Sequence, residues 1–220
     1  MSVCNIAFLE GHILCLADTL QYDADGEPGG LRGPKVSIHE GGFALIARGL
    51  VRAGEAARAV ACLARDIDHA HELLASAHEQ MLAHREYDPE IRVETSLMGY
   101  SPARGDLVVW RWEILNGRDA VAFSELPRGL HLAPSWVATA PEMPADMGAE
   151  RMAKIALAQW KVAQRFNWNM CIGGRMHMTT ITRDGITQEE VGRYPDYSTH
   201  TTQFGDPLTE SPTVADVVCR

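Results

Sequence analysis

The hydrophobic positions at the start of the chain fall into short apolar runs separated by tight turns, which predicts two β-hairpins. The first pair of runs turns at Glu10-Gly11-His12 and the second at Glu40-Gly41-Gly42. Between the pairs, residues 23–34 are rich in Gly, Asp and Pro and are expected to form a loop. The four predicted strands are residues 2–9, 13–17, 35–39 and 43–47.

The middle and the end of the chain carry helical spacing of apolar residues. From Gly54 to about His84 the sequence is rich in Ala, Leu, Glu and His, which predicts one long helix or two consecutive helices. Residues 147–166 predict an amphipathic helix, with Gln159 as the one polar residue on its apolar side. Further strands are expected at residues 91–99, 107–114, 120–123 and 176–181.

Two segments show no regular pattern. Residues 126–145 contain four prolines and predict a loop, and the polar tail after about residue 195 predicts irregular structure. The remaining elements lack the regular strand–helix–strand alternation of a doubly wound parallel sheet. An α+β fold with helices packed on antiparallel sheet therefore fits the order better.

Composition narrows the classes of protein without identifying a substrate. The chain has 220 residues, 46% of them hydrophobic, and a net charge of −9. Because no basic stripe occurs, we do not expect nucleic acid as a partner. No apolar run reaches the roughly 18 residues of a membrane helix, and no export signal is evident. Five scattered cysteines without a C-x-x-C pair favour reduced thiols, so we expect a cytoplasmic protein with no membrane partner.

The histidines and acidic residues between Asp66 and His84 raise the question of a metal site. Ligands would have to share one helix face, but His69 and His71 diverge. A solvated helix face is therefore the favoured interpretation. We expect no metal and no cofactor.

Several short motifs follow one another in a recognisable order: Ser2 on the first strand, Ala17-Asp18-Thr19, Pro34-Lys35-Val36, Arg48-Gly49-Leu50, Gly173-Gly174 and Ile181-Thr-Arg-Asp-Gly185. Taken together, they resemble proteasome β-type subunits of the N-terminal-nucleophile hydrolase family. The opening Met-Ser-Val-Cys and Arg165-Phe166-Asn167 look most like the bacterial ancestral β-subunit (Anbu) group. The resemblance implies a four-layer αββα sandwich over residues 1–195, two antiparallel sheets flanked by helices, followed by an irregular tail at 196–220.

The resemblance also implies the roles of the site residues. Ser2, exposed by loss of Met1, would be the nucleophile, and its own α-amine would be the base. Lys35 would lower the pKa of the Ser2 hydroxyl, Asp18 would orient Lys35, and the Gly49 N–H would stabilise the oxyanion. The remaining implied site residues are the substrate-binding Ala47, Val51 and Ser37, and the catalytic Asn169. Ala47 is small, which suggests a roomy pocket for a large apolar side chain.

One departure from the family concerns residues 167–171, where the family usually supplies an Asp near the active amine. Here the segment contains Asn167 and Asn169 and no Asp. Asn can hydrogen-bond an amine but brings no charge. Each motif also has an ordinary alternative, because Ser2 could be a trivial second residue, Lys35 an exposed strand residue and Asp18 a turn cap.

The sequence therefore predicts an N-terminal-serine amidohydrolase, a proteasome-like peptidase that forms an acyl-enzyme on Ser2. A non-catalytic proteasome-like scaffold subunit and an amidase for a small non-peptide amide remain open alternatives. The expected partners are a peptide or amide substrate and further copies of the chain in a ring or helical stack. Whether an ATPase assists is not given by the sequence.

Overall fold

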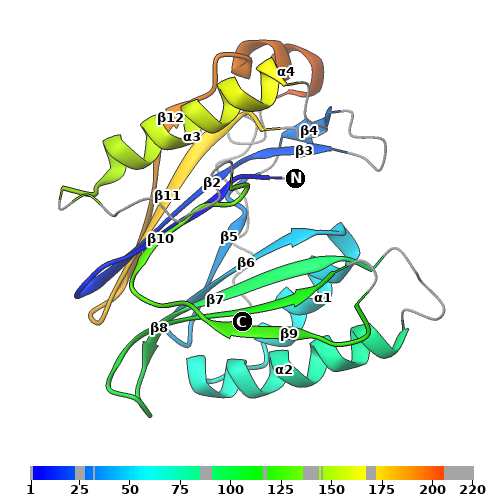
Figure 1. Ribbon diagram of the computed structural model, residues 1–220, viewed down its shortest axis with the longest axis vertical. Helices are drawn as coiled ribbons and strands as arrows, with labels where there is room; N and C mark the ends of the chain where they lie inside the picture. Colours follow the sequence, from blue (N-terminus) through cyan, green and yellow to red (C-terminus); the bar gives the residue numbers. More distant parts are fainter. Residues whose placement is uncertain are drawn as a thin grey trace. The chain divides into compact units, whose positions relative to one another are not determined.

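The structure, a computed structural model, divides the chain into two compact units (Figure 1). It describes residues 2–22, 28–31, 33–84, 91–115, 118–135, 144, 146–166 and 172–205. The first unit consists of the described residues of Met1–Lys35, Arg128–Thr180 and Thr187–Val217. The second consists of those of Val36–Pro127 and Ile181–Ile186.

The first sheet has five strands in the order β10-β1-β2-β11-β12. Its strand β1 pairs antiparallel with β2 on one side and with β10 on the other. The strands are β1 (Cys4–Phe8), β2 (His12–Asp18), β10 (Gly129–His131), β11 (Arg175–Thr182) and β12 (Ile186–Arg193). The first unit also contains a small antiparallel pair, β3 (Leu20–Tyr22) and β4 (Pro28–Leu31), and the helices α3 (Ala149–Arg165) and α4 (Tyr197–Phe204).

The core of the first unit lies between its sheet and α3. Leu14 and Leu16 of β2 and Met176 of β11 are buried together with Met152 and Ala156 of α3. The spacing of the buried α3 residues is the helical period that the sequence predicted. This packing holds β1 and β2, and therefore the amino-terminal segment, in a fixed frame.

Gln159 is the exception in this apolar face, and the structure shows why it is polar. Its side-chain amide bonds that of Asn5 in β1 in both directions, with N–O distances of 2.6 and 2.9 Å. It also donates to the carbonyl of Pro134 at 2.9 Å, while the amide of Ala133 donates to Asn5 Oδ1. Both side chains are buried, so the Asn5 Nδ2 donor depends on Gln159 Oε1 for its hydrogen bond.

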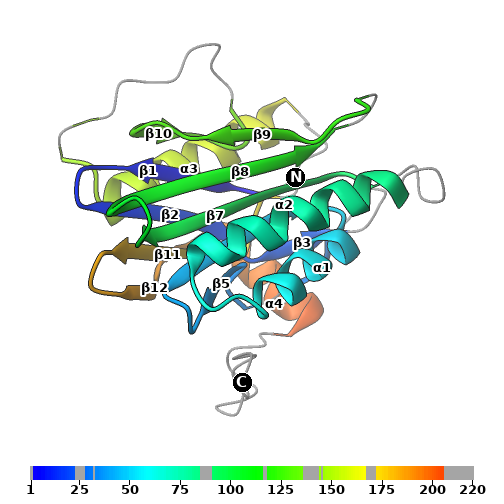
Figure 2. The ribbon, with the colours of Figure 1, turned by 90° about the horizontal axis from the view of Figure 1, so that it is seen from below.

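The second unit contains an antiparallel sheet in the order β5-β6-β7-β8-β9 (Figure 1), and Figure 2 shows β7, β8 and β9 of this sheet side by side. Its strands are β5 (Val36–His39), β6 (Phe43–Gly49), β7 (Val93–Ser101), β8 (Asp106–Ile114) and β9 (Ala122–Glu125). Two helices, α1 (Val51–Ala61) and α2 (Ile67–Ala83), pack on this sheet through an apolar cluster that includes Phe43, Leu74 and Leu97. The two helices are separate because Asp66 caps α2, accepting a hydrogen bond from the His69 amide at 2.8 Å.

Two of the α2 histidines that raised the metal question, His71 and His78, take part in packing. The His71 ring lies 4.5 Å from the Trp110 ring and 5.2 Å from the Trp112 ring, centroid to centroid. His78 is buried and bonds the Leu74 carbonyl and Thr95 Oγ1 at 2.7 and 2.9 Å. Burial lowers the pKa of both imidazoles, which favours their neutral form.

Several sequence-based expectations need correction. The loop predicted at residues 23–34 contains β4, the proline-rich segment contains β10, and the tail predicted to be irregular begins with α4. Cys4 and Cys15 are free and buried, but Cys62 is disulfide-bonded, so the expectation of reduced thiols is wrong for Cys62. Within the described ranges, no helix is long and apolar enough to cross a membrane.

The Asn5–Gln159 pair gives a test of the first unit. We expect Gln159→Leu to lower the free energy of unfolding by about 1–3 kcal/mol, because the buried amide of Asn5 then loses its partner. Gln164→Leu makes the same chemical change on the exposed face of α3 and should cost less than about 0.5 kcal/mol. Urea denaturation of both variants measures the difference. Equal losses in the free energy of unfolding would contradict the conclusion that the Asn5–Gln159 hydrogen bonds stabilise the first unit.

Candidate active site

Lys35 is the centre of a compact polar group at the amino-terminal end of the first unit. Its ammonium donates to Ser2 Oγ at 2.6 Å, to Asp18 Oδ1 at 3.0 Å and to the Leu20 carbonyl at 2.6 Å. An ammonium has three N–H donors, so these three acceptors match its capacity. The Lys35 side chain is only 10% exposed. The lysine is therefore held in one place beside the Ser2 hydroxyl.

Asp18 anchors this group from the end of β2. Its side chain is 0% exposed, and Oδ1 also accepts a hydrogen bond from the Val3 amide at 2.9 Å. Burial raises the pKa of Asp18, while the Lys35 charge and the amides of Val3 and Gly173 oppose that rise. Asp18 therefore bonds both Val3, which follows Ser2 in the chain, and Lys35, which bonds the Ser2 hydroxyl.

The glycine pair before β11 allows the backbone to reach this group. Gly174 has φ +82°, and a Cβ there would collide with Thr19 Oγ1. Thr19 Oγ1 in turn accepts from the Arg175 amide at 2.8 Å, and the Gly173 carbonyl accepts from the Leu20 amide at 3.2 Å. The segment that presents the Leu20 carbonyl to Lys35 is therefore fixed by β11. The sequence showed the glycine pair, but it did not show that the pair lets this backbone pack against Thr19 and Leu20.

Gly49 belongs to the second unit, where it is the last residue of β6. Its φ is +109°, and a Cβ there would run into the Arg92 carbonyl, so glycine has a backbone reason at this position. Leu50 follows as the N-cap of α1, and its amide donates to the same carbonyl at 2.8 Å. Arg48 bonds both carboxylate oxygens of Glu94 at 3.0 Å, which fixes the end of β6.

The predicted substrate-binding residues also lie in the second unit. Ala47 faces α1 so closely that a Cβ on Gly54 would lie 3.1 Å from the Ala47 Cβ. This close approach of helix and strand is a packing reason for a small residue at 47. Val51 is 45% exposed at the start of α1, and Ser37 Oγ donates to the Leu45 carbonyl at 3.1 Å. Asn169 lies outside the described residues.

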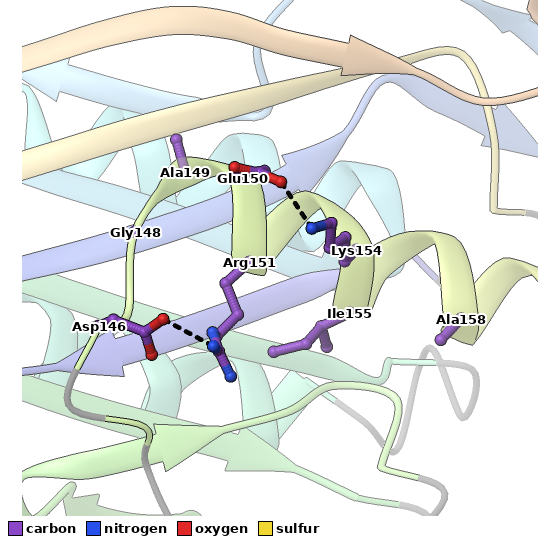
Figure 3. Close-up of a pocket in the computed structure, with 8 residues that line it drawn as sticks. All are labelled: Asp146, Gly148, Ala149, Glu150, Arg151, Lys154, Ile155 and Ala158. Carbon is purple, nitrogen blue, oxygen red and sulfur yellow. Dashed lines mark hydrogen bonds and ion pairs between the residues drawn. The ribbon is translucent and has the colours of Figure 1, made fainter.

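A surface hollow near the start of α3 is a different feature (Figure 3). Its charged residues pair with one another, Arg151 with Asp146 at 2.7 Å and Lys154 with Glu150 at 2.5 Å. The described residues that line it include no serine, threonine, cysteine or histidine. These lining residues therefore offer no hydroxyl, thiol or imidazole nucleophile, and their charged groups are already paired, so the group around Lys35 is the candidate site.

Comparison with known proteins identifies the fold. No protein-family model matches the chain, and no curated protein matches its sequence. Among solved structures, a Gly-1 mutant of Anbu from Hyphomicrobium sp. strain MC1 superposes with a TM-score of 0.56 over 95% of both chains, at 14% identity. A second structure of Anbu from the same strain gives 0.55, covering 94% of this chain and 95% of that one, at 15% identity. The chain has the Anbu fold.

The Anbu fold confirms the expectation of a proteasome-like α+β architecture with two large antiparallel sheets and helices. At 14–15% identity the likeness to Anbu shows the fold alone. The likeness therefore assigns no role to Ser2, Asp18, Lys35 or Gly49.

The Lys35–Asp18 pair can be tested without reference to activity. We expect Lys35→Met to lower the free energy of unfolding by about 3 kcal/mol, because it leaves the Asp18 carboxylate buried without its counter-ion. Adding Asp18→Asn should recover part of that loss, so the double variant is more stable than the two single changes predict.

Lys154→Met is the matched control, because Lys154 is 70% exposed and its ion pair with Glu150 lies on the surface. Its cost should be below about 1 kcal/mol. Urea denaturation of the four variants gives the coupling energy. Additive effects of the Lys35 and Asp18 changes would show that the pair is not a coupled buried unit.

Proposed function

We propose that this chain is an N-terminal-serine amidohydrolase, a proteasome-like peptidase that cleaves amide bonds through an acyl-enzyme on Ser2. The observation that carries the proposal is the 2.6 Å hydrogen bond from Lys35 Nζ to Ser2 Oγ, within a group anchored by buried Asp18. A lysine held against a serine near the chain start has a direct use in nucleophilic catalysis.

The reaction requires that Met1 is removed, since the base is then the α-amine of Ser2 itself. An α-amine has an ordinary pKa near 8, which suits proton transfer around neutral pH. The amine takes the proton of the Ser2 hydroxyl as Oγ attacks the amide carbonyl. The resulting ammonium gives that proton to the departing amine nitrogen when the C–N bond breaks. Water then attacks the Ser2 ester, with the amine again as base, and releases the acid product.

Lys35 and Asp18 have electrostatic roles in this scheme. The Lys35 ammonium stabilises negative charge as it develops on Ser2 Oγ, which lowers the pKa of the hydroxyl. Asp18 keeps Lys35 in place and balances its charge in a buried setting. Neither residue has to exchange a proton during the reaction.

The remaining assignments extend the proposal beyond the Lys35 group. The Gly49 N–H is proposed as the oxyanion donor, a contribution that is typically about 3–4 kcal/mol. Ala47, Val51 and Ser37 are proposed to contact the substrate, and Asn169 to assist the amine. Homo-oligomerisation stays a prediction from the sequence resemblance.

The direct test is intact-mass spectrometry after treatment with a serine-directed electrophile such as a fluorophosphonate. We expect loss of Met1 and a single adduct, located on Ser2 by peptide mapping. Ser2→Ala should abolish the adduct, and Lys35→Met should slow its formation by about 100-fold, because the hydroxyl loses its charged partner. Ser76→Ala, which removes an exposed serine on α2, should leave the rate unchanged.

The alternatives give different results in the same experiment. A chain that retains Met1, or that shows no adduct on Ser2, would overturn the proposal in favour of a non-catalytic scaffold subunit. An adduct with cleavage of small amides but not peptides would indicate an amidase for a small substrate.

A further inference from the structure

Asp196, in the turn between β12 and α4, is a partly buried carboxylate, 24% exposed, with partners from two helices. The Trp160 indole of α3 donates to Asp196 Oδ2 at 3.0 Å, and His200 Nε2 of α4 lies 3.4 Å from the same oxygen. The Asp196 carbonyl accepts from the amides of Thr199 and His200, so the residue also starts α4. These contacts leave the carboxylate little freedom to move.

The Asp196 carboxylate and the Leu20 side chain border Gly173, and a Cβ built there would lie 2.9 Å from Leu20 Cδ2. A Cβ built on Gly173 would lie 3.2 Å from Oδ1 and 3.4 Å from Oδ2 of Asp196. Such distances are as tight as or tighter than ordinary van der Waals contact, so the carboxylate occupies the space that a side chain at 173 would need. Asp196 and Leu20 therefore leave room only for glycine at 173.

Gly173 connects directly to the Lys35 group. Its carbonyl accepts from the Leu20 amide at 3.2 Å, and the Leu20 carbonyl accepts from Lys35 Nζ at 2.6 Å. The next residue, Gly174, accepts from the Tyr194 amide at 3.0 Å. The backbone around the glycine pair is thus held between the Asp196 turn and the strand end that presents an acceptor to Lys35.

Tyr194, whose amide bonds the Gly174 carbonyl, is a buried residue two positions before Asp196. It is 2% exposed, and burial together with the charges of Asp18 and Asp196 raises the pKa of its phenol well above the ordinary value. The charges of Asp18 and Asp196 therefore both act on this phenol.

We propose that Asp196 is a positioning residue for the Ser2 site, which acts by fixing Gly173 and through it the Leu20 carbonyl that holds Lys35. The inference rests on the proposed function for its effect on reaction, but its effect on Lys35 stands on the contacts alone. Asp196 lies in the segment that the sequence interpretation assigned to an irregular tail. In this proposal, the start of that segment positions the backbone that holds Lys35.

The first readout is the acylation rate of Lys35 by acetic anhydride, followed by mass spectrometry at a temperature well below unfolding. The chain has three lysines, and exposed Lys154 and Lys161 are internal references. We expect Asp196→Ala to raise the rate at Lys35 several-fold relative to Lys154, because a loosened Leu20 carbonyl frees the ammonium. Trp160→Phe, which removes only the indole donor, should give a smaller rise.

A control separates positioning from general loosening. Ile155→Ala removes a partly buried side chain that packs on the same apolar cluster of the first unit. It should leave the relative Lys35 rate unchanged although it lowers stability. Equal rises in Asp196→Ala and Ile155→Ala, or no rise in Asp196→Ala, would overturn the proposal.

The second readout is the rate at which the fluorophosphonate adduct forms on Ser2. Asp196→Ala should slow it by about tenfold, as small displacements of positioned groups do, while Asp196→Glu should recover part of the rate. If the wild-type chain forms no adduct but Asp196→Ala still exposes Lys35, the proposed function fails and the positioning role stands. An adduct rate unaffected by Asp196→Ala would overturn the role in catalysis.

Discussion

A carboxylate removed from water must find a positive partner, and in this chain that constraint fixes the amino terminus. Asp18 is fully buried at the end of β2, and Lys35 supplies its counter-charge at 3.0 Å. The same Oδ1 binds the Val3 amide, and the same ammonium binds Ser2 Oγ. One buried ion pair thus determines where the first residues of the chain lie. The chemistry proposed for Ser2 depends on it.

The surrounding backbone is arranged so that this pair can form. Glycines at 173 and 174 let the start of β11 approach Thr19 and Leu20 more closely than any side chain would allow. That approach directs the Leu20 carbonyl to Lys35, and Asp196 closes the arrangement from the other side. Rigid strands on an apolar core, with few movable side chains at the site, are what a preorganised nucleophile requires.

The sequence was informative where local pattern and chain order determine structure. The apolar runs predicted the strands beside Ser2, Asp18 and Lys35, whereas the grouping of these three residues was predicted from the resemblance to proteasome β-type subunits. The small elements β4, β10 and α4 could not be predicted, because their sequences are rich in proline, glycine or polar residues. Contacts with distant parts of the chain stabilise these elements, and the local pattern does not show such contacts. The same holds for Gln159 and Asp196, whose partners lie up to 154 residues away in the sequence.

The central claim is that the Ser2 hydroxyl, at the mature amino terminus, is bonded by the ammonium of Lys35. A crystal structure of the purified chain, with its first residue identified by mass, measures this most directly. The account predicts Ser2 as the first residue, with Lys35 Nζ within hydrogen-bonding distance of both Ser2 Oγ and Asp18 Oδ1. A retained Met1, or a Lys35 side chain turned away from Ser2, would contradict it.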